Sequence, residues 1–460
     1  MELCSSFRVL FEAFSPVFSP ACFPLWQTLM TGWVLSHRHR YISDLIVSSD
    51  ATRDGDWSRF YRFFNRYKWS LDDVCEIVAR LVINTLVPSD AVIVLAIDDT
   101  LCRKRGLGLF GVGMHHDPLI SSRGMKLVSW GHDWVLLTVV ITGLKWAPPI
   151  VFALPIGFRL YINKQGKTKG QKKDKRGSSG KGKAKAAPAG HKTRPQLAVE
   201  LILLVSAWFP DRKFVVVADS LYGGHSVVGE LPDNVDIISR ATLKAALYER
   251  TPQPTGGRGR PRKKGERLPL IAEWADDPRC PWTTLTIDQY GLHTTLRWKR
   301  QEALFYGVGK NRLMSMIVVE DLEGKRGRQV FFCSNTNWSL QFILCTYASR
   351  WSIEVTFENL KQLMGFADAA NWKELAVLRT APMAGVMYSL IVVWFHQEGH
   401  QHVEFPHRPW YPQKKWPSFG DMLTTLRRLS FEGKNAECMG NAQATNNLFR
   451  QLTYFLSLAG

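Results

Sequence analysis

The sequence predicts an α/β fold in which buried strands end in acidic side chains. Two runs, AVIVLAIDDT at 91–100 and KFVVVADSLYGG at 213–224, are continuously apolar and then reach aspartates. Such runs are typical of strands covered on both faces of a sheet. Between them, RPQLAVELILLVSAWF at 194–209 has the pattern of a helix with proline in its first turn. Strands that alternate with helices indicate an α/β domain.

The first 88 residues have a helical pattern. Apolar residues recur at helical spacing in WSRFYRFFNRYKWSLDDVCEIVARLVINTL, and Ser70 is a plausible N-cap. Four basic residues lie among the aromatic ones: Arg59, Arg62, Arg66 and Lys68. They suit a helical DNA-binding module, but they equally suit a core-facing helix whose long basic side chains reach solvent. We predict a DNA-binding-like helical domain at 1–88.

The next segments complete the order of the elements. WVLLTVVITGLKWAPPIVFALPIG at 134–157 predicts two strands around a Gly-Leu-Lys turn, and VDIISRATL at 235–243 predicts a further strand. Strand, hairpin, helix, strand, helix and strand is the order of an RNase H-like domain with a mixed sheet. Asp99 and Asp219 would stand at the carboxyl ends of two strands, where open α/β sheets place their sites.

The domain boundaries follow from these patterns. The RNase H-like domain is expected in two parts, separated by a β-rich insertion with its own basic Gly/Pro loop and followed by a C-terminal tail or helical region. The ranges are 89–243 with a basic flexible loop at 163–194, then 244–329 with the loop 250–267, then 330–398, and finally 399–460.

The positive charge is concentrated in two short segments. The chain has a formal net charge of +19; residues 164–194 contribute a net +11 and residues 250–267 a net +6. Both segments are rich in Gly, Pro, Ser and Lys, which predicts mobile loops. Concentrated positive charge on such loops suits phosphate backbones more than it suits a solubilising linker. We therefore expect double-stranded DNA as the partner.

The second basic segment contains a more specific pattern. Arg258-Gly259-Arg260-Pro261 resembles an AT-hook, in which arginines on an extended backbone enter a narrow A·T minor groove. The pattern is four residues long and recurs by chance in basic loops. Arg258 and Arg260 are therefore predicted to contact DNA, with general phosphate contact as the alternative to minor-groove binding.

Cysteine usage and hydropathy indicate a soluble cytoplasmic protein with no membrane partner. The eight cysteines are scattered without a CxxC pair, which argues against a disulfide framework and a zinc site. No basic segment precedes an apolar run at the N-terminus, so no signal peptide is predicted. The apolar run at 383–395 is too short to span a bilayer and predicts a buried helix.

The stretch YASRWSIEVTFENLKQ at 347–362 arranges charged and aromatic residues regularly. On one helix at about 100° per residue, Arg350, Glu354 and Lys361 fall within about 60° of Tyr347. An exposed face with local ion pairs would explain this pattern. The apolar neighbours Trp351, Ile353 and Phe357 instead predict a packed helix whose charges face a cleft.

These residues also resemble a known family. Tyr347, Arg350, Glu354 and Lys361 match the Y-(2)-R-(3)-E-(6)-K signature of bacterial insertion-sequence DDE transposases. AIDDT and VVADSLYG look like the family's first two acidic motifs, and the β-rich segment at 244–330 looks like its insertion. The resemblance covers roughly 90 to 395 and is closest to the branch called DDE superfamily endonucleases.

The resemblance implies a two-metal site for cutting and joining DNA. Two Mg²⁺ ions about 4 Å apart would stabilise the attacking and leaving oxygens, with Mn²⁺ as a plausible substitute. It implies that the ions are held by Asp99, Asp219 and Glu354. It implies that DNA is contacted by Arg350, Lys361 and Tyr347. A homodimer on DNA and a bacterial, nucleoid-associated location are expected by resemblance alone.

Several assignments stay open. Asp98 competes with Asp99, and Glu358 competes with Glu354. His115, His116 and His132 lie near Asp117 and Asp133, but magnesium sites seldom recruit imidazole, so we interpret them as loop and strand-end residues. Three insertion tryptophans are candidates for stacking on a flipped base, although ordinary core packing is favoured for each: Trp274, Trp282 and Trp298.

Three hypotheses of function follow. The leading one is a DDE transposase that binds the terminal inverted repeats of its own element and catalyses metal-dependent strand cleavage and strand transfer. The second is a catalytically degenerate copy that binds DNA without cutting it. The third is a non-transposing nuclease of RNase H fold.

Overall fold

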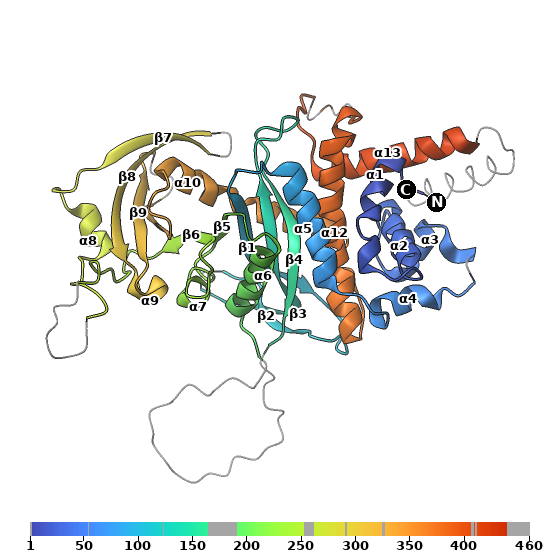
Figure 1. Ribbon diagram of the computed structural model, residues 1–460, viewed down its shortest axis with the longest axis horizontal. Helices are drawn as coiled ribbons and strands as arrows, with labels where there is room; N and C mark the ends of the chain where they lie inside the picture. Colours follow the sequence, from blue (N-terminus) through green and yellow to red (C-terminus); the bar gives the residue numbers. More distant parts are fainter. Residues whose placement is uncertain are drawn as a thin grey trace, which may run out of the picture.

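The computed structural model describes most of the chain (Figure 1). The described residues are 2–438, except 54, 123, 164–190, 253–261, 290–291, 324–326, 406–408 and 410–411. The predicted DNA contacts Arg258 and Arg260 lie outside these residues, as does most of the first basic segment. A large mixed sheet forms the centre of the fold, with helices on both of its faces and at one end.

The N-terminal residues form helices, in agreement with the sequence pattern. The helices are α1 (Ser5–Glu12), α2 (Phe23–Leu35), α3 (Ile42–Ser48), α4 (Ser58–Asn65) and α5 (Leu71–Leu86). The predicted N-cap is confirmed, since the Ser70 hydroxyl accepts a hydrogen bond from the Asp73 amide at 3.3 Å. Helices α1, α2, α4 and α5 contact α12 (Glu374–Gln397), so this region shares its core with the rest of the chain.

In the described part of the chain, the sheet has ten strands in one continuous layer. Their order is β2-β3-β1-β5-β6-β10-β9-β8-β7, with β4 paired to β3 along the edge opposite β1, which it shares with β2. The strands of the first half are β1 (Ile93–Arg103), β2 (Gly113–His116), β3 (Val128–Ile141), β4 (Phe152–Tyr161), β5 (Phe214–Ala218) and β6 (Val235–Ala241). Strands β1, β5 and β6 run parallel, while β3 and β4 form the predicted hairpin.

One detail of β1 differs from the prediction. Asp98 and Asp99 were expected at the carboxyl end of a strand, but β1 continues to Arg103 because it pairs with β3 over its whole later half. Its parallel pairing with β5 ends at Ile97 and Ala218. The next residues along these two strands are Asp98 and Asp219, so the acids lie where the parallel part of the sheet stops.

Helices cover the two faces of this part of the sheet. A Cβ on Gly157 of β4 would meet Leu201 of α6 (Arg194–Trp208), whereas the ring of the next residue, Phe158, lies against Gly385 of α12. Successive residues of a strand point to opposite faces, so α6 and α12 lie on opposite sides of the sheet. Helix α11 (Ser352–Gln362) also contacts β1 and β4.

Helix α12 is longer than the predicted buried helix at 383–395. Its 24 residues are long and apolar enough to cross a bilayer by length and composition, but the apolar window is 94% buried inside the structure. Its side chains pack on β4, α4, α5 and the C-terminal helix α13 (Phe419–Cys438). The prediction of burial is confirmed, and α12 is the central core helix of the fold.

The β-rich segment extends the same sheet. It contains β7 (Thr283–Gln289), β8 (Leu292–Leu304) and β9 (Leu313–Asp321), with the short helices α8 (Ile271–Asp276), α7 (His225–Val228) and α9 (Tyr306–Gly309) nearby. Strand β10 (Gln329–Cys333) pairs with both β6 and β9 and so joins the two halves. Figure 1 shows this segment at one end of the molecule and the N-terminal helices at the other.

Candidate active site

Two adjacent acids of β1 point to opposite faces of the sheet. Asp98 accepts a hydrogen bond from Arg350 Nη1 at 2.7 Å on the side that α11 covers. Asp99 accepts a hydrogen bond from the Tyr222 hydroxyl at 2.7 Å and lies 3.3 Å from Arg194 Nε on the side of α6. Each carboxylate is thus held by a different set of elements, as the alternation of a strand requires.

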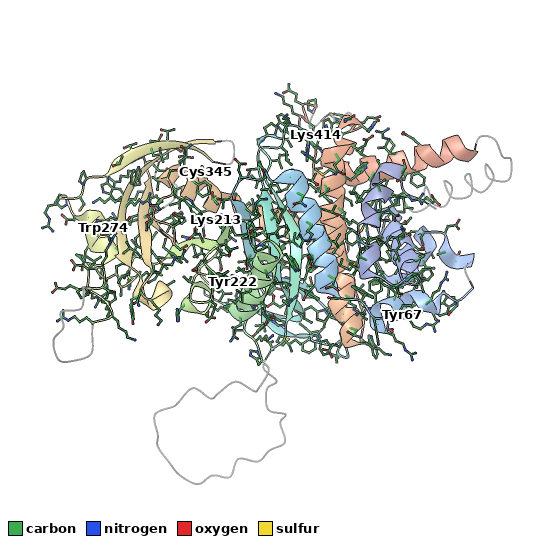
Figure 2. All side chains as sticks on the ribbon, in the orientation of Figure 1. Tyr67, Lys213, Tyr222, Trp274, Cys345 and Lys414 are labelled. Atoms are coloured by element: carbon green, nitrogen blue, oxygen red, sulfur yellow. The ribbon has the colours of Figure 1, made fainter. Side chains whose placement is uncertain are left out.

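Asp219 begins the loop that leaves β5. Its Oδ1 accepts a hydrogen bond from the Leu221 amide at 2.8 Å, which closes an Asx-type turn. Position 223 requires a glycine, because a Cβ there would lie 2.4 Å from the Ser239 hydroxyl oxygen. The turn places Tyr222, labelled in the central part of Figure 2, against Asp99.

Tyr222 and Arg194 were missed by the sequence analysis. Tyr222 is fully buried and follows Asp219 by three residues. The tyrosine of the ADSLYGG turn was therefore the sequence signal for a hydroxyl group beside the end of the strand. Arg194 was counted only as one of many basic residues. The signal for its position was the predicted helix start, because Thr193 and Gln196 form a capping box that fixes Arg194 as the first residue of α6.

The stretch 347–362 is not one helix. It is divided between α10 (Leu340–Ser349) and α11, and the amides of Arg350 and Trp351 bond three residues back, to Tyr347 and Ala348. Arg350 and Trp351 keep αR backbone angles, but these three-residue steps interrupt the regular α-helical repeat, so the single-helix stripe predicted for Tyr347, Arg350, Glu354 and Lys361 is wrong in its geometry. Trp351 at the junction is 55% exposed, whereas Ile353 and Phe357 are buried as expected.

Arg350 nevertheless links the predicted residues. Its Nη1 bonds Asp98 and lies 3.9 Å from Glu354 Oε1. Tyr347 sits on its other side, where its ring packs on Phe331 at 4.7 Å between centroids. Tyr347 also lines a cavity of about 100 Å³ between α10 and strands β8, β9 and β10.

The two candidates on α11 differ in their surroundings. Glu354 is in the first turn of α11, half-buried and next to Arg350. Glu358 is exposed and accepts a hydrogen bond from Gln362 Nε2 at 3.1 Å. Lys361 lies in the last turn of α11. Burial raises the pKa values of Asp133 on β3 and Cys102 on β1, and the charge of Lys361 opposes that rise. The structure therefore brings Glu354, and not Glu358, to the arginine that meets Asp98.

The acids of the strand ends are electrostatically crowded. Burial raises the pKa of Asp98 to about 7, against the opposing effect of Arg350, and Asp99 and Asp219 raise it further. Burial also raises the pKa of Asp99 to about 6, with Asp133 and Asp219 adding to it and Tyr222 and Arg194 opposing it. Asp219 is thus close enough to both acids to affect their protonation. Removing charge from water is costly, so these carboxylates favour a cation as partner.

The donor chemistry fits a hard divalent cation. Carboxylate oxygens are the ligands that Mg²⁺ prefers, and Asp98, Asp99 and Asp219 supply them at one edge of the parallel strands. Within the described part of the chain, no group of three or more His, Cys, Asp or Glu side chains stands close enough to hold an ion. Asp98 and Asp99 are each paired with an arginine instead, so binding of an ion requires these pairs to rearrange.

The histidines near the strands belong to the packed interior. Burial lowers the pKa of His115 and of His132 to about 4 each, and His132 Nε2 lies 2.8 Å from the Phe110 carbonyl oxygen. Among the described residues they form no metal group. The three histidines were expected as loop and strand-end residues; this holds for His116, at the exposed end of β2, whereas His115 and His132 lie within β2 and β3.

The three tryptophans of the insertion have different surroundings. Trp274 is 8% exposed, and Figure 2 labels it at the far end of the molecule from the N-terminal helices. Trp298 is partly buried against the core. Trp282 lies beneath three cationic side chains, with the closest, Arg297, 4.7 Å from its ring centroid. Core packing therefore accounts for Trp274 and Trp298, and cation–π contacts account for Trp282.

Comparisons with known proteins place the sequence in a family. A family model described as "DDE superfamily endonuclease" matches residues 28–304, which are 277 of the 460 residues. No curated protein matches the chain. Among solved structures, the cryo-EM structure of the piggyBac transposase synaptic complex with hairpin DNA is similar at a TM-score of 0.39 and 12% identity, covering 97% of this chain and 81% of that one. A similarity of that degree does not establish a shared fold.

Proposed function

The chain belongs to the DDE superfamily endonuclease family, and we propose that it is a DDE transposase that binds the terminal inverted repeats of its own element and catalyses DNA strand cleavage and strand transfer. The observation that carries this proposal is the meeting of three segments distant in sequence. Strand β1, the loop after β5 and the α10–α11 junction bring Asp98, Asp219 and Glu354 around Arg350, while Asp99 points to the opposite face of β1, toward Arg194 and Tyr222.

Each residue has a chemical role in this proposal. Asp99, Asp219 and Glu354 hold divalent cations, which when bound stabilise the attacking and leaving oxygens of a phosphodiester. Arg350 and Lys361 hold DNA phosphates beside the site, and Tyr347 contacts the backbone or an adjacent base. Asp98 anchors Arg350 through its 2.7 Å hydrogen bond, so that the guanidinium is in place before DNA arrives.

Several finer assignments are part of the same proposal. The strand order β4-β3-β1-β5-β6 supports an RNase H-like fold, because two antiparallel strands flank a parallel group that carries the acids. The spacing of Tyr347, Arg350, Glu354 and Lys361 supports the YREK group and an insertion-sequence origin. Mg²⁺ as the native ion, a homodimer on DNA and a cytoplasmic, nucleoid-associated location complete it.

The decisive experiment is cleavage of a duplex that carries the inverted repeats flanking the gene. With Mg²⁺ or Mn²⁺, the wild-type chain is expected to nick the duplex at the repeat end. Asp219→Ala and Glu354→Gln are expected to lower the rate by at least about 100-fold, because each removes a cation ligand. Glu358→Gln is the matched control on the same helix and is expected to cleave like the wild type, since Glu358 is exposed and away from Arg350.

Other outcomes would redirect the assignment. Full activity in Asp219→Ala would contradict the site. Activity that survives in Asp99→Asn but disappears in Asp98→Asn would move the first ligand to Asp98. Salt-sensitive binding without any nicking would indicate a degenerate DNA-binding copy. Nicking without joining of pre-cut ends to target DNA would indicate a nuclease that does not transpose.

A further inference from the structure

A pocket of about 370 Å³ lies at the base of the second basic segment, in the β-rich half of the protein. Its described lining residues are cationic, aromatic or glycine, and none of them is acidic: Arg262, Lys263, Lys264, Gly265 and Tyr306. Tyr306 begins α9, and Lys264 Nζ and Lys310 Nζ lie 5.3 Å and 5.4 Å from the centroid of its ring. The face of an aromatic ring attracts cations, so Tyr306 holds two positive charges beside the pocket.

The described ends of the basic segment form a fixed base for this pocket. The Thr251 hydroxyl donates a hydrogen bond to the Lys263 carbonyl oxygen at 3.0 Å, and Tyr248 forms an antiparallel β-bridge with Arg267. Lys264 also lies over the ring of Tyr248, with its Nζ 3.6 Å from the centroid. These contacts keep the Lys264 ammonium in place before a ligand arrives, which lowers the entropic cost of binding.

The cations of the pocket have no carboxylate partner. Within the described part of the chain, no ion pair is formed by Arg262, Lys263, Lys264 or Lys310. Other arginines of the β-rich half are paired: Arg250 with Glu302, Arg279 with Asp277, Arg312 with Asp236 and Arg328 with Glu320. Cations gathered without acids repel one another, and an anion placed between them relieves this repulsion.

Lys310 stands at a backbone position that favours glycine. Its φ is +50° and its ψ is −114°, and the Arg312 amide bonds the Gly309 carbonyl oxygen at 2.9 Å. These values describe a type II′ turn with Lys310 as its second residue, where a positive φ strains any residue that has a Cβ. Such strain clusters at functional positions. A lysine where glycine fits better indicates that its charge has a task.

The pocket is connected to the loop that carries Asp219. Helix α9 packs on α7, where His225 Nδ1 lies 2.9 Å from the Val308 carbonyl oxygen. Helix α7 directly follows the turn that begins at Asp219. Packed elements therefore join the pocket to the candidate site.

We propose that this pocket binds a backbone phosphate of duplex DNA, with the ammonium groups of Lys264 and Lys310 as donors and the Tyr306 ring between them. Repeated phosphates suit several cations around one pocket better than a single carboxylate does. The inference rests on the proposed function, which makes DNA the ligand. It extends that function by adding a contact surface in the β-rich half, separate from the residues that surround Arg350.

Fluorescence anisotropy of a labelled repeat-end duplex tests this proposal on the full-length chain, in EDTA and at several salt concentrations. Lys264→Gln and Lys310→Gly are each expected to lower the slope of log K against log salt by about 1, and the double variant by about 2. A duplex of unrelated sequence is expected to show the same reductions, because a phosphate contact does not read sequence.

Two controls separate a local contact from a general loss of charge or of structure. Arg279→Gln also removes one charge from the β-rich half, but this guanidinium pairs with Asp277 at 2.8 Å, so its slope is expected to match the wild type. Lys310→Gly is expected to raise the urea midpoint of unfolding, because glycine suits the positive φ, so its weaker binding is not caused by unfolding.

Two results would overturn the inference. One is that both lysine variants have the same slope as Arg279→Gln. The other is that Lys310→Gly lowers the urea midpoint and the affinity together while Lys264→Gln binds like the wild type, which would mean that Lys310 serves the fold.

A failure of the proposed function looks different. If the wild type shows no salt-dependent binding to either duplex, the chain does not bind DNA and the proposed function fails. If the wild type binds and both lysine variants bind like it, the proposed function stands and only the role of the pocket is refuted. Because EDTA removes divalent cations, neither result depends on the cation site.

Discussion

The adjacent aspartates of strand β1 contact two different sets of residues. Asp98 meets Arg350 from the α10–α11 junction, and Asp99 meets Arg194 from α6 and the Tyr222 hydroxyl. Both carboxylates are largely buried, which would be costly without these partners. The two arginines therefore keep a crowded acidic site folded, and they also set what a cation must displace in order to bind.

Buried histidines at the same sheet make the stability of the fold sensitive to acid. Burial lowers the pKa of His132 to about 4, with Lys104 adding to the effect against the hydrogen bond to the Phe110 carbonyl. The unfolded chain binds a proton on this histidine near pH 6.5, while the folded chain stays neutral there. The stability that the neutral ring provides is therefore complete above about pH 6.5 and is lost as the pH falls toward about 4.

The variant His132→Gln tests this prediction by urea unfolding between pH 7.5 and 4.5. The glutamine amide can still donate to the Phe110 carbonyl but does not titrate. The wild type is expected to lose about 1–3 kcal/mol more than the variant over this range. Equal losses in both proteins would mean that His132 does not couple folding to pH. His116, which is exposed, provides the control through His116→Gln, whose pH profile should match the wild type.

At the scale of elements, short local contacts decide where helices begin and break. The capping box at Thr193 and Gln196 sets the start of α6 and hence the position of Arg194. The tight turns at Arg350 and Trp351 end α10 and restart the chain as α11. Arg350 lies at this break, and its Nη1 donates a hydrogen bond to Asp98 at 2.7 Å.

Helix α12 packs closely against the sheet at Gly385. A Cβ on Gly385 would lie 2.3 Å from Cζ and 2.6 Å from Cε1 of Phe158 on β4. Gly385→Ala is therefore expected to destabilise the protein by about 1–3 kcal/mol through overpacking. This exceeds the gain of about 1 kcal/mol that alanine usually brings to a helix.

Chemical denaturation of four proteins checks this contact. The wild type is compared with Gly385→Ala, with Phe158→Leu and with the double variant Gly385→Ala, Phe158→Leu. The smaller leucine leaves room for the new methyl group. Gly385→Ala is therefore expected to cost less free energy of unfolding in the Phe158→Leu protein than in the wild type. A stabilised Gly385→Ala protein would show that α12 can shift without cost.

At the scale of the whole molecule, one sheet connects the candidate site to the β-rich end. Strand β10 pairs with β6 beside the site and with β9 of the β-rich segment. The segment was expected as an insertion, and its strands prolong the central sheet instead of forming a separate one. Continuous hydrogen-bonded pairing thus connects the β-rich end to the strands that carry the acids.

The charge distribution belongs to the same scale. Of the net charge of +19, residues 164–194 contribute +11, so DNA affinity should depend strongly on salt through this segment. Replacing six lysines between 164 and 190 by serine is expected to reduce the slope of log K against log salt by up to about 5. Fluorescence anisotropy with a labelled duplex at several salt concentrations measures the slope.

A scrambled version of residues 164–190 is the control for composition. It keeps every charge and changes only the order of residues, so its slope should equal that of the wild type. A slope unaffected by the six replacements would show that other basic residues make the phosphate contacts. The segment would then have no part in DNA binding at equilibrium.

Much of the architecture was predictable because it depends on local patterns. Apolar runs identified β1, the β3–β4 hairpin, β5 and β6, the N-cap Ser70 identified the start of α5, and a first-turn proline identified the start of α6. The resemblance of AIDDT and VVADSLYG to acidic motifs indicated a DDE endonuclease, and a family model of that description matches residues 28–304, which contain both motifs. Each of these signals lies within a few residues of the feature that it predicts.

The sequence by itself determined the elements, the charge and the family of this protein. Only the tertiary structure decided which side chains meet: Arg350 with Asp98, Tyr222 and Arg194 with Asp99, and Arg194 with Asp133. These partners are separated by 61 to 252 residues. Such contacts follow from strand order, register and helix direction, which are properties of packing and leave no mark in the local sequence.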